Sequence, residues 1–139
     1  MDSLSERIPP EVERLLDGLR RHGYAIADER YDPDHFGDAL AVLESDRTRV
    51  RVVRDRGQWF VEVAGARGGE WFAPVIWKAF LDGSAPPAVA VSFEDQARLL
   101  LDEREAIEAS ARALDEDGLA RLRALRAQRA EARRALPPS

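Results

Sequence analysis

One short segment of the chain gathers side chains that could do chemistry. Residues 32–38, with the sequence DPDHFGD, place three carboxylates and the imidazole of His35 within seven positions. Carboxylates are ligands for hard cations, and an imidazole could join them in a transition-metal site. The spacing does not match an EF-hand loop, however, and Asp, Pro and Gly are also the ordinary residues of turns. We therefore predict a turn without metal ligands and keep metal binding as an alternative.

No other sequence motif in the chain indicates a particular catalytic activity. The chain has no cysteine, and the nucleophile-elbow, Walker, dinucleotide-binding and HExxH patterns are absent. The other histidine, His22, falls at the end of an expected helix, where a cation is stabilised by the helix dipole. We therefore predict no catalytic residue, no bound cofactor and no enzymatic activity.

Basic and aromatic side chains are interleaved in residues 49–63, which have the sequence RVRVVRDRGQWFVEV. A basic sheet with exposed aromatic rings would suit single-stranded nucleic acid. Trp59 and Phe60 are adjacent, however, so they point to opposite faces of a strand. The net charge of −5 also opposes a general nucleic-acid binder, because such binding depends on neutralising phosphates. We predict no nucleic-acid partner.

The same segment is typical of a β-hairpin. Residues 55–57, Asp-Arg-Gly, match a three-residue loop whose last position has a positive φ, where glycine costs least. This loop would place Arg54 opposite Gln58 and Val53 opposite Trp59. We expect the face that carries Trp59 to be packed by helices and the other face to be partly covered.

A group of aromatic residues follows the hairpin: Trp71, Phe72, Trp77 and Phe80. Tryptophan and arginine are favoured at protein interfaces, although most such aromatic residues belong to a core. We therefore expect at most one of the two tryptophans to be substantially exposed. The candidate partner-binding residues are Trp71, Trp77, Arg54 and Arg56.

Apolar periodicity and capping residues place the other elements around the hairpin. We expect, in order, a helix over 10–22, strands over 24–31 and 39–45, the hairpin, a short helix beginning at Pro74 and closed by residues 82–83, and a long helix over 93–114 capped by Ser92. These elements predict an α+β fold: an antiparallel β-meander packed by an N-terminal helix and a short helix, followed by a C-terminal helical pair. The chain is expected to form one domain over 1–139, with a core over about 10–114.

The last expected helix, residues 115–139, is rich in arginine and lacks a clean apolar face. Its leucines share one side of the helical wheel with Arg126, Arg129 and Arg133. Such a helix either folds back on the acidic helix before it through ion pairs, or projects from the domain and frays.

The N-terminal sequence, the apolar stretches and the cysteine content indicate the cellular compartment of the protein. The N-terminal sequence MDSLSERIPPEVERLLDGL has acidic residues and two prolines where a signal peptide needs a basic start and an apolar run. No stretch approaches the roughly eighteen apolar residues of a membrane span. The absence of cysteine suits a reducing compartment. We expect a cytoplasmic protein without a membrane partner.

Residues 36–63, FGDALAVLESDRTRVRVVRDRGQWFVEV, resemble a pattern seen in small uncharacterised proteins of GC-rich bacteria, some of them similar to immunity proteins of polymorphic toxin systems. The shared features are Phe36-Gly37, Leu43-Glu44-Ser45 and Asp55-Arg56-Gly57-Gln58, followed by an aromatic residue and alternating apolar positions. The resemblance runs from about Tyr24 to Asp82 and is structural rather than catalytic. It implies a non-enzymatic protein-binding protein that occludes a cognate toxin, and an acidic chain would suit a basic nuclease as that partner.

Two alternatives come from other functional classes. The chain could be a structural or regulatory module that dimerises through its C-terminal helices, so that its partner is a second copy. It could also be an enzyme or a metal protein that uses the loop at residues 32–38. A protein partner, such as a toxin domain, is the leading expectation.

Overall fold

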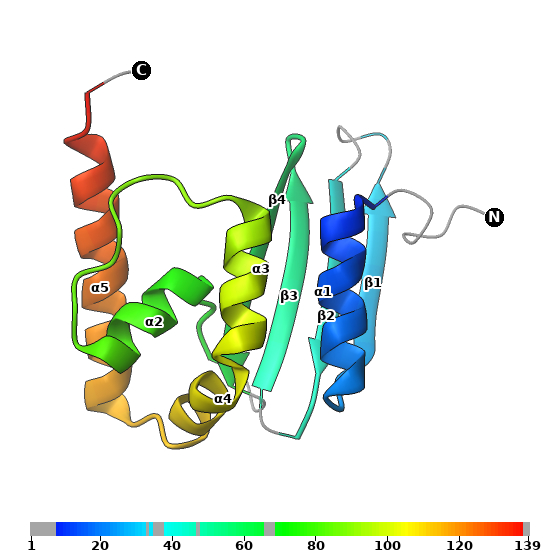
Figure 1. The fold of residues 1–139 in the computed structure, drawn as a ribbon, viewed down its shortest axis with the longest axis horizontal. Coiled ribbons are helices and arrows are strands. Elements are labelled where there is room, and N and C mark those ends of the chain that lie inside the picture. Colours follow the sequence, from blue (N-terminus) through cyan, green and yellow to red (C-terminus); the bar gives the residue numbers. More distant parts are fainter. Residues whose placement is uncertain (1–7, 33, 35–37, 47, 66–68, 138–139) are drawn as a thin grey trace.

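The strands and helices alternate little along the chain, because all four strands lie between the first helix and the second (Figure 1). A computed structural model describes residues 8–32, 34, 38–46, 48–65 and 69–137. The strands are β1 (Ala25–Asp32), β2 (Asp38–Glu44), β3 (Thr48–Asp55) and β4 (Gln58–Gly65). The helices are α1 (Pro10–Arg21), α2 (Pro74–Asp82), α3 (Phe93–Asp102), α4 (Arg104–Arg112) and α5 (Glu116–Arg134).

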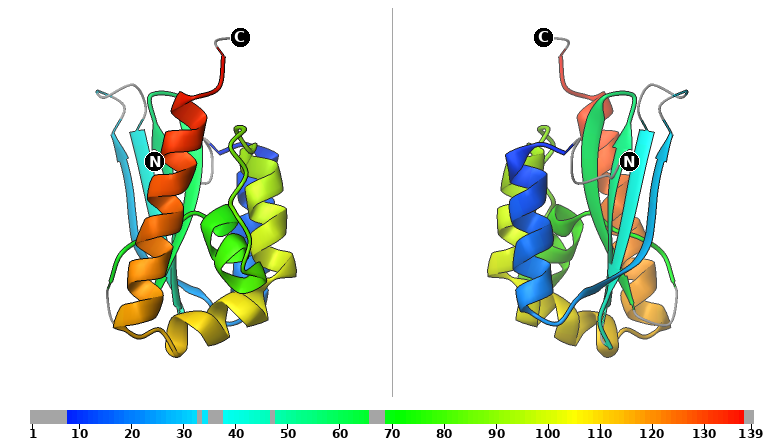
Figure 2. Two further views of the ribbon diagram at one scale, coloured as in Figure 1. Left: turned by 90° about the vertical axis from the view of Figure 1, so that its left-hand side faces the viewer. Right: turned by 90° about the vertical axis from the view of Figure 1, so that its right-hand side faces the viewer.

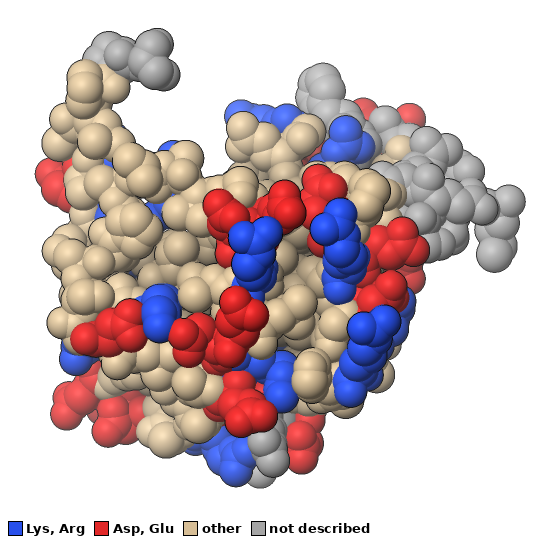
Figure 3. All heavy atoms as spheres, in the orientation of Figure 1, with Lys and Arg blue, Asp and Glu red and all other residues tan. Residues whose placement is uncertain are grey.

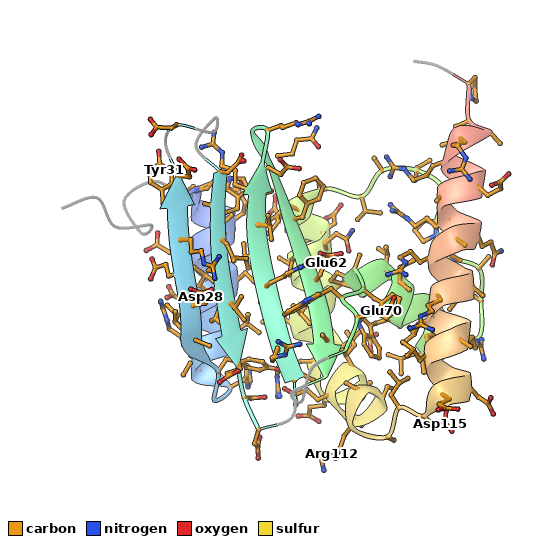
Figure 4. All side chains as sticks on the ribbon, turned by 180° about the vertical axis from the view of Figure 1, so that it is seen from behind. Asp28, Tyr31, Glu62, Glu70, Arg112 and Asp115 are labelled. Atoms are coloured by element: carbon orange, nitrogen blue, oxygen red, sulfur yellow. The ribbon has the colours of Figure 1, made fainter. Side chains whose placement is uncertain are left out.

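The strands form one antiparallel sheet in the order β1-β2-β3-β4, which is the predicted meander. Helices α1 and α3 pack side by side on one face of this sheet (Figure 2). Figure 4, turned to the other side, shows the strands with no helix in front of them. The α+β class predicted from the sequence is therefore confirmed, and the sheet has a covered face and an open face.

Alternation along the strands decides which face is covered. Leu43, Val50 and Val63 lie opposite one another across β2, β3 and β4, and none is more than 1% exposed. Side chains at the alternate positions of these strands point to the open face, and among them Arg51 is half-buried and Phe60 is exposed. The expectation that the face of Trp59 is the packed one is confirmed, because Trp59 and Val63 share a side of β4.

The hairpin pairs one position away from the predicted register. Its loop has two residues, Arg56 and Gly57, with φ of 52° and 82°, and Asp55 faces Gln58. The three-residue loop that placed Arg54 opposite Gln58 is wrong. Positive φ at both loop positions gives a turn whose twist matches the two strands, and this match outweighs the strain of a left-handed arginine. The Arg56 N–H donates to Asp38 Oδ1 at 3.2 Å, which ties the turn to β2.

Helices α1 and α2 begin and end close to where prolines and glycine predict. Pro10 and Pro74 occupy the opening turns, and Gly83 ends α2 with a φ of 66°. The predicted cap of α3 is also confirmed, because Ser92 Oγ accepts the Asp95 N–H at 3.1 Å. Within the described ranges, no helix combines the length and the apolar composition needed to cross a bilayer.

The long helix predicted over 93–114 is wrong, because the chain breaks into α3 and α4 at Glu103. Glu103 has a φ of −103° and a ψ of 15°, outside the helical range. Its carboxylate accepts a hydrogen bond of 2.6 Å from Lys78 Nζ on α2. The bend lets α4 turn under the end of the sheet (Figure 1), so apolar side chains such as Ile107 reach the core.

Helix α5 follows neither of the two predicted courses. It packs on α2, and its side chains Leu122 and Leu125 are 0% and 7% exposed within the main hydrophobic cluster. The core therefore extends past residue 114. Its arginines make ion pairs with Glu70, which precedes α2, rather than forming the predicted pairs with the acidic helix before it.

Candidate functional site

The four side chains predicted to bind a partner do not lie together. Trp77 is 1% exposed and packs edge-on against Phe72 and Phe80 in the core. Its indole N–H donates to the Val63 carbonyl at 3.3 Å, so its one polar group is satisfied internally. A partner surface in this fold therefore does not include Trp77.

Trp71 is half-buried under two arginines of β3. The guanidinium carbons of Arg49 and Arg51 lie 4.8 Å and 4.7 Å from the centre of its ring, within cation–π range. Arg51 also makes a 2.6 Å ion pair with Glu62, across the open face of the sheet. These contacts hold the two half-buried arginines of β3 in place, and they leave little of the Trp71 ring to a partner.

Arg54 and Arg56 lie at the other end of the hairpin from Trp71. Arg56 is exposed in the turn itself. Arg54 faces Trp59 across the strands and lines a large hollow at the surface of the described residues. The structure thus brings only Arg54 of the four predicted residues to a concave surface.

That hollow is an open groove of about 1390 Å³ between the β3–β4 hairpin and the C-terminal half of α5. We call it the hairpin groove and define it by Leu40, Val53, Phe60, Val91, Arg129 and Arg133, which line it. The space-filling view shows the end of α5 standing away from the body of the molecule, with the surface hollowed beside it (Figure 3). Its volume exceeds the range of about 300–1,000 Å³ typical of small-molecule pockets, so an extended protein segment fits it better.

The hairpin wall of the groove is apolar. Phe60 is 45% exposed at the edge strand β4, and Val53 lies directly opposite it on β3. Leu40 lies opposite Val53 and continues the same face on β2, while its neighbours Ala39 and Ala41 are buried on the other face. Large apolar side chains left accessible in a groove commonly mark a binding surface.

The α5 wall of the groove is basic. Arg126, Arg129 and Arg133 follow one another at steps of three and four residues, so they share one side of the helix. Arg126 Nη2 lies 2.8 Å from Glu70 Oε2 and its guanidinium carbon lies 4.7 Å from the centre of the Phe72 ring. Arg129 donates to two backbone carbonyls instead of a carboxylate, Pro87 O at 2.9 Å and Val89 O at 3.2 Å.

Arg129 sits in an unfavourable electrostatic position for a cation. Burial lowers the pKa of its guanidinium first, and the positive charge of Arg133 lowers it further. Arginine stays protonated in proteins, so this shift indicates a charge that is partly desolvated and also repelled by Arg133, not a loss of charge. A negative group placed in the groove would relieve that repulsion.

Glu70 fixes the position of α5 beside the sheet (Figure 4). Its carboxylate accepts hydrogen bonds from both Arg123 and Arg126, and these bonds are the main reason why its pKa lies below the usual value. The first turn of α5 is capped by Asp115, whose Oδ1 accepts the Gly118 N–H at 2.8 Å. Leu122 and Leu125 then anchor the helix, which leaves its last turns to form the groove wall.

A second cluster of polar groups lies inside the protein. Tyr24 donates to Glu108 Oε2 at 2.7 Å, its oxygen is also hydrogen-bonded to Thr48 Oγ1, and Arg104 Nη1 donates to Glu108 Oε1 at 2.9 Å. Glu108 and Thr48 are 3% and 0% exposed. Among the described side chains no buried polar atom lacks a hydrogen-bond partner. The cluster is closed to substrates, so we interpret it as a structural tie between the sheet and α4.

The structure gives little support to the remaining candidate site residues, which are His22 and the loop 32–38. His22 is exposed at the end of α1, as expected for its place in the sequence. In the loop 32–38, His35 and residues 33, 36 and 37 lie outside the described residues. Within the described part of the chain, no group of three or more His, Cys, Asp or Glu side chains could hold a metal ion.

Sequence reasoning missed the groove because its two walls are far apart in the chain. A signal was nevertheless present, since the leucines and arginines of the last helix share one side of the helical wheel. Leu122 and Leu125 take the inner part of that side, and Arg126 and Arg129 take its flank along the groove. Phe60 was assigned to a face but not recognised as exposed.

We compared the chain with protein families, with curated proteins and with solved structures. No protein-family model, curated protein or solved structure matches the chain.

Proposed function

We propose that the chain is a non-enzymatic protein-binding protein of the immunity type, which occludes a cognate bacterial toxin with its hairpin groove. The observation that carries the proposal is Phe60, a large apolar side chain that is 45% exposed in a groove with an arginine-lined opposite wall. Aromatic and arginine side chains are the residues that dominate the binding energy of protein interfaces. A cytoplasmic location is part of the same proposal.

The other face of the molecule favours the groove as the interface. Over α1 and α3, acidic and basic side chains are interspersed, and several make local ion pairs such as Arg98 with Glu94 (Figure 3). Surface pairs of this kind contribute little binding energy and mutually neutralise. The hairpin groove, by contrast, combines accessible apolar area with charge of one sign on α5.

Dimerisation through the C-terminal helices has less support. The leucines that would form such an interface, Leu122 and Leu125, are buried against α2 of the same chain. The side chains that α5 leaves at its surface are mainly arginine and alanine, with acidic residues among them, and they make a poor apolar seam.

Co-expression with the product of the adjacent gene tests the proposal. The wild-type chain should protect cells from that product and form a complex with it on gel filtration. Phe60→Ser should weaken the complex by about tenfold or more, because truncating a central aromatic residue commonly costs more than 1 kcal/mol.

Leu136→Ser is the matched control. Leu136 is 42% exposed, close to the value for Phe60, but it lies after α5 and outside the groove lining. This variant should protect cells as well as the wild type. Failure of the wild-type chain to protect, together with the absence of a complex, would remove the immunity proposal.

A further inference from the structure

We infer that the hairpin groove takes an acidic, extended segment of the protein partner, with a carboxylate held by Arg129 and Arg133 and apolar side chains packed against Phe60. This inference rests on the proposed function and specifies the chemistry of the partner. It concerns the segment that enters the groove, so the rest of the partner can carry charge of either sign.

Arg129 is held in place with donors to spare. Its Nε and Nη2 atoms donate to the carbonyls of Pro87 and Val89, which fixes the plane of the guanidinium against the segment between α2 and α3. An arginine side chain carries five N–H donors, so several still point away from these carbonyls. A pre-positioned guanidinium recognises a carboxylate with a smaller loss of side-chain freedom than a mobile one.

Arg133 completes the pair on the next turn of the helix. Residues four apart on a helix are neighbours, so Arg133 and Arg129 present their charges toward the same part of the groove. Neither makes an ion pair with a carboxylate in the described part of the chain, whereas Arg123 and Arg126 share Glu70. Two like charges without a counter-ion, one of them partly buried, favour an anionic ligand.

The rest of the lining favours a peptide over a nucleic acid. Asp38, Asp55 and Glu62 also line the groove on the hairpin side, and they would repel a continuous phosphate backbone. A peptide can place a carboxylate at the arginine wall and uncharged side chains at the hairpin. Phe60 and Val53, which are paired across the hairpin, then contact the apolar side chains of the peptide.

A pair of labelled peptides tests this chemistry directly. One is a short fluorescein-labelled peptide of glutamate and leucine, and the other has glutamine at every glutamate position. Fluorescence anisotropy at low salt should show binding of the acidic peptide to the full chain and about tenfold weaker binding of its neutral counterpart, because the neutral peptide has no carboxylate to accept charge-assisted hydrogen bonds from the guanidinium groups. Added salt should weaken the acidic peptide selectively.

Three variants locate the site. Arg133→Gln, which removes no side-chain hydrogen bond or ion pair found among the described residues, should reduce binding of the acidic peptide by about tenfold. Arg129→Lys keeps the charge but loses the planar donors and should weaken binding to a smaller extent. Arg112→Gln removes an exposed arginine of α4, a helix that contributes no residue to the groove lining, and should have no effect. Thermal melting of each variant checks that the fold is retained.

The outcomes separate this inference from the proposed function. Equal binding of the acidic and neutral peptides, or binding that is indifferent to Arg133→Gln, would overturn the acidic-segment inference even if co-expression still yields a complex. Tighter binding of a single-stranded oligonucleotide with the same dependence on Arg133 would also overturn it, because the groove would then be a nucleic-acid site.

Discussion

Tyr24 donates a hydrogen bond of 2.7 Å to Glu108 Oε2 across 84 positions of the chain, and this contact joins the start of the sheet to α4. The single hydroxyl proton of Tyr24 goes to the carboxylate, so the hydrogen bond between Tyr24 and Thr48 has the threonine as donor. Arg104 neutralises the other carboxylate oxygen. An ion pair is thereby held inside the protein with its hydrogen bonds satisfied.

Removing the carboxylate from this cluster should destabilise the fold strongly. Glu108→Ala leaves the 14%-exposed Arg104 side chain and the Tyr24 hydroxyl without their acceptor, and we expect a loss of about 3 kcal/mol in the free energy of unfolding. Urea denaturation measures it. Glu105→Ala is the control, since Glu105 contacts the same arginine with a side chain that is 87% exposed, and its loss should stay within about 0.5 kcal/mol. Equal losses for the two variants would contradict the structural role of Glu108.

Stability at alkaline pH should report on Tyr24. Burial, with Glu108 adding to it, raises the pKa of Tyr24 from 10.0 to about 12 in the folded protein. The unfolded chain therefore loses this proton first, and stability should fall by about 1.4 kcal/mol per pH unit between pH 10 and pH 12. Tyr24→Phe should lack this part of the decline. Urea denaturation at a series of pH values checks the difference, and parallel declines in both proteins would exclude Tyr24 as its source.

The packing of α5 beside the sheet should weaken at acidic pH. The pKa of Glu70 is lowered by its hydrogen bonds to Arg123 and Arg126, so the stabilisation that it provides is present above the unfolded value of 4.5 and is lost as pH falls through the folded pKa. The protection factors of α5 amides, which correct for the intrinsic pH dependence of exchange, should fall over that range. In Glu70→Gln these protection factors should be lower already at neutral pH and lack this acid dependence. Glu131→Gln, which breaks only a pair within α5, should behave like the wild type.

The two-residue turn predicts opposite effects at its two positions. Gly57→Ala forces alanine to a φ of 82° and should cost about 1 kcal/mol, and no atom lies close enough to an added Cβ to contribute a clash. Arg56→Asn should instead gain about 0.5 kcal/mol, because asparagine tolerates the left-handed conformation better. Thermal melting measures both. A destabilised Arg56→Asn would contradict the turn geometry.

The parts of the fold that local chemistry determines could be predicted from the sequence. Pro10 and Pro74 at helix starts, Gly83 at a helix end and Ser92 as a cap each act within a few residues. Alternation in β4 also assigned its two faces, because side chains in a strand point to opposite sides whatever its partner.

The missed features depend on contacts between distant segments. The hairpin register depends on Arg56 in a left-handed conformation. Residues other than glycine rarely adopt a positive φ, but here the twist of the two strands favours it. The break at Glu103 contains neither glycine nor proline, and its contact with Lys78 on α2 cannot be read from the helical pattern. The arginines of α5 form a groove wall only because Glu70 and the hairpin lie beside that helix.

Hydrogen exchange of the complex with the adjacent gene product tests the central claim most directly, because it maps the contact surface without any substitution. If the hairpin groove is the binding site, amides around the hairpin turn, residues 53–60, and in the last turns of α5, residues 126–134, should exchange more slowly in the complex. Amides of α4, which contributes no residue to the groove lining, should not change. Protection confined to α4, with the hairpin and α5 unaffected, would contradict the assignment of the groove as the partner-binding surface.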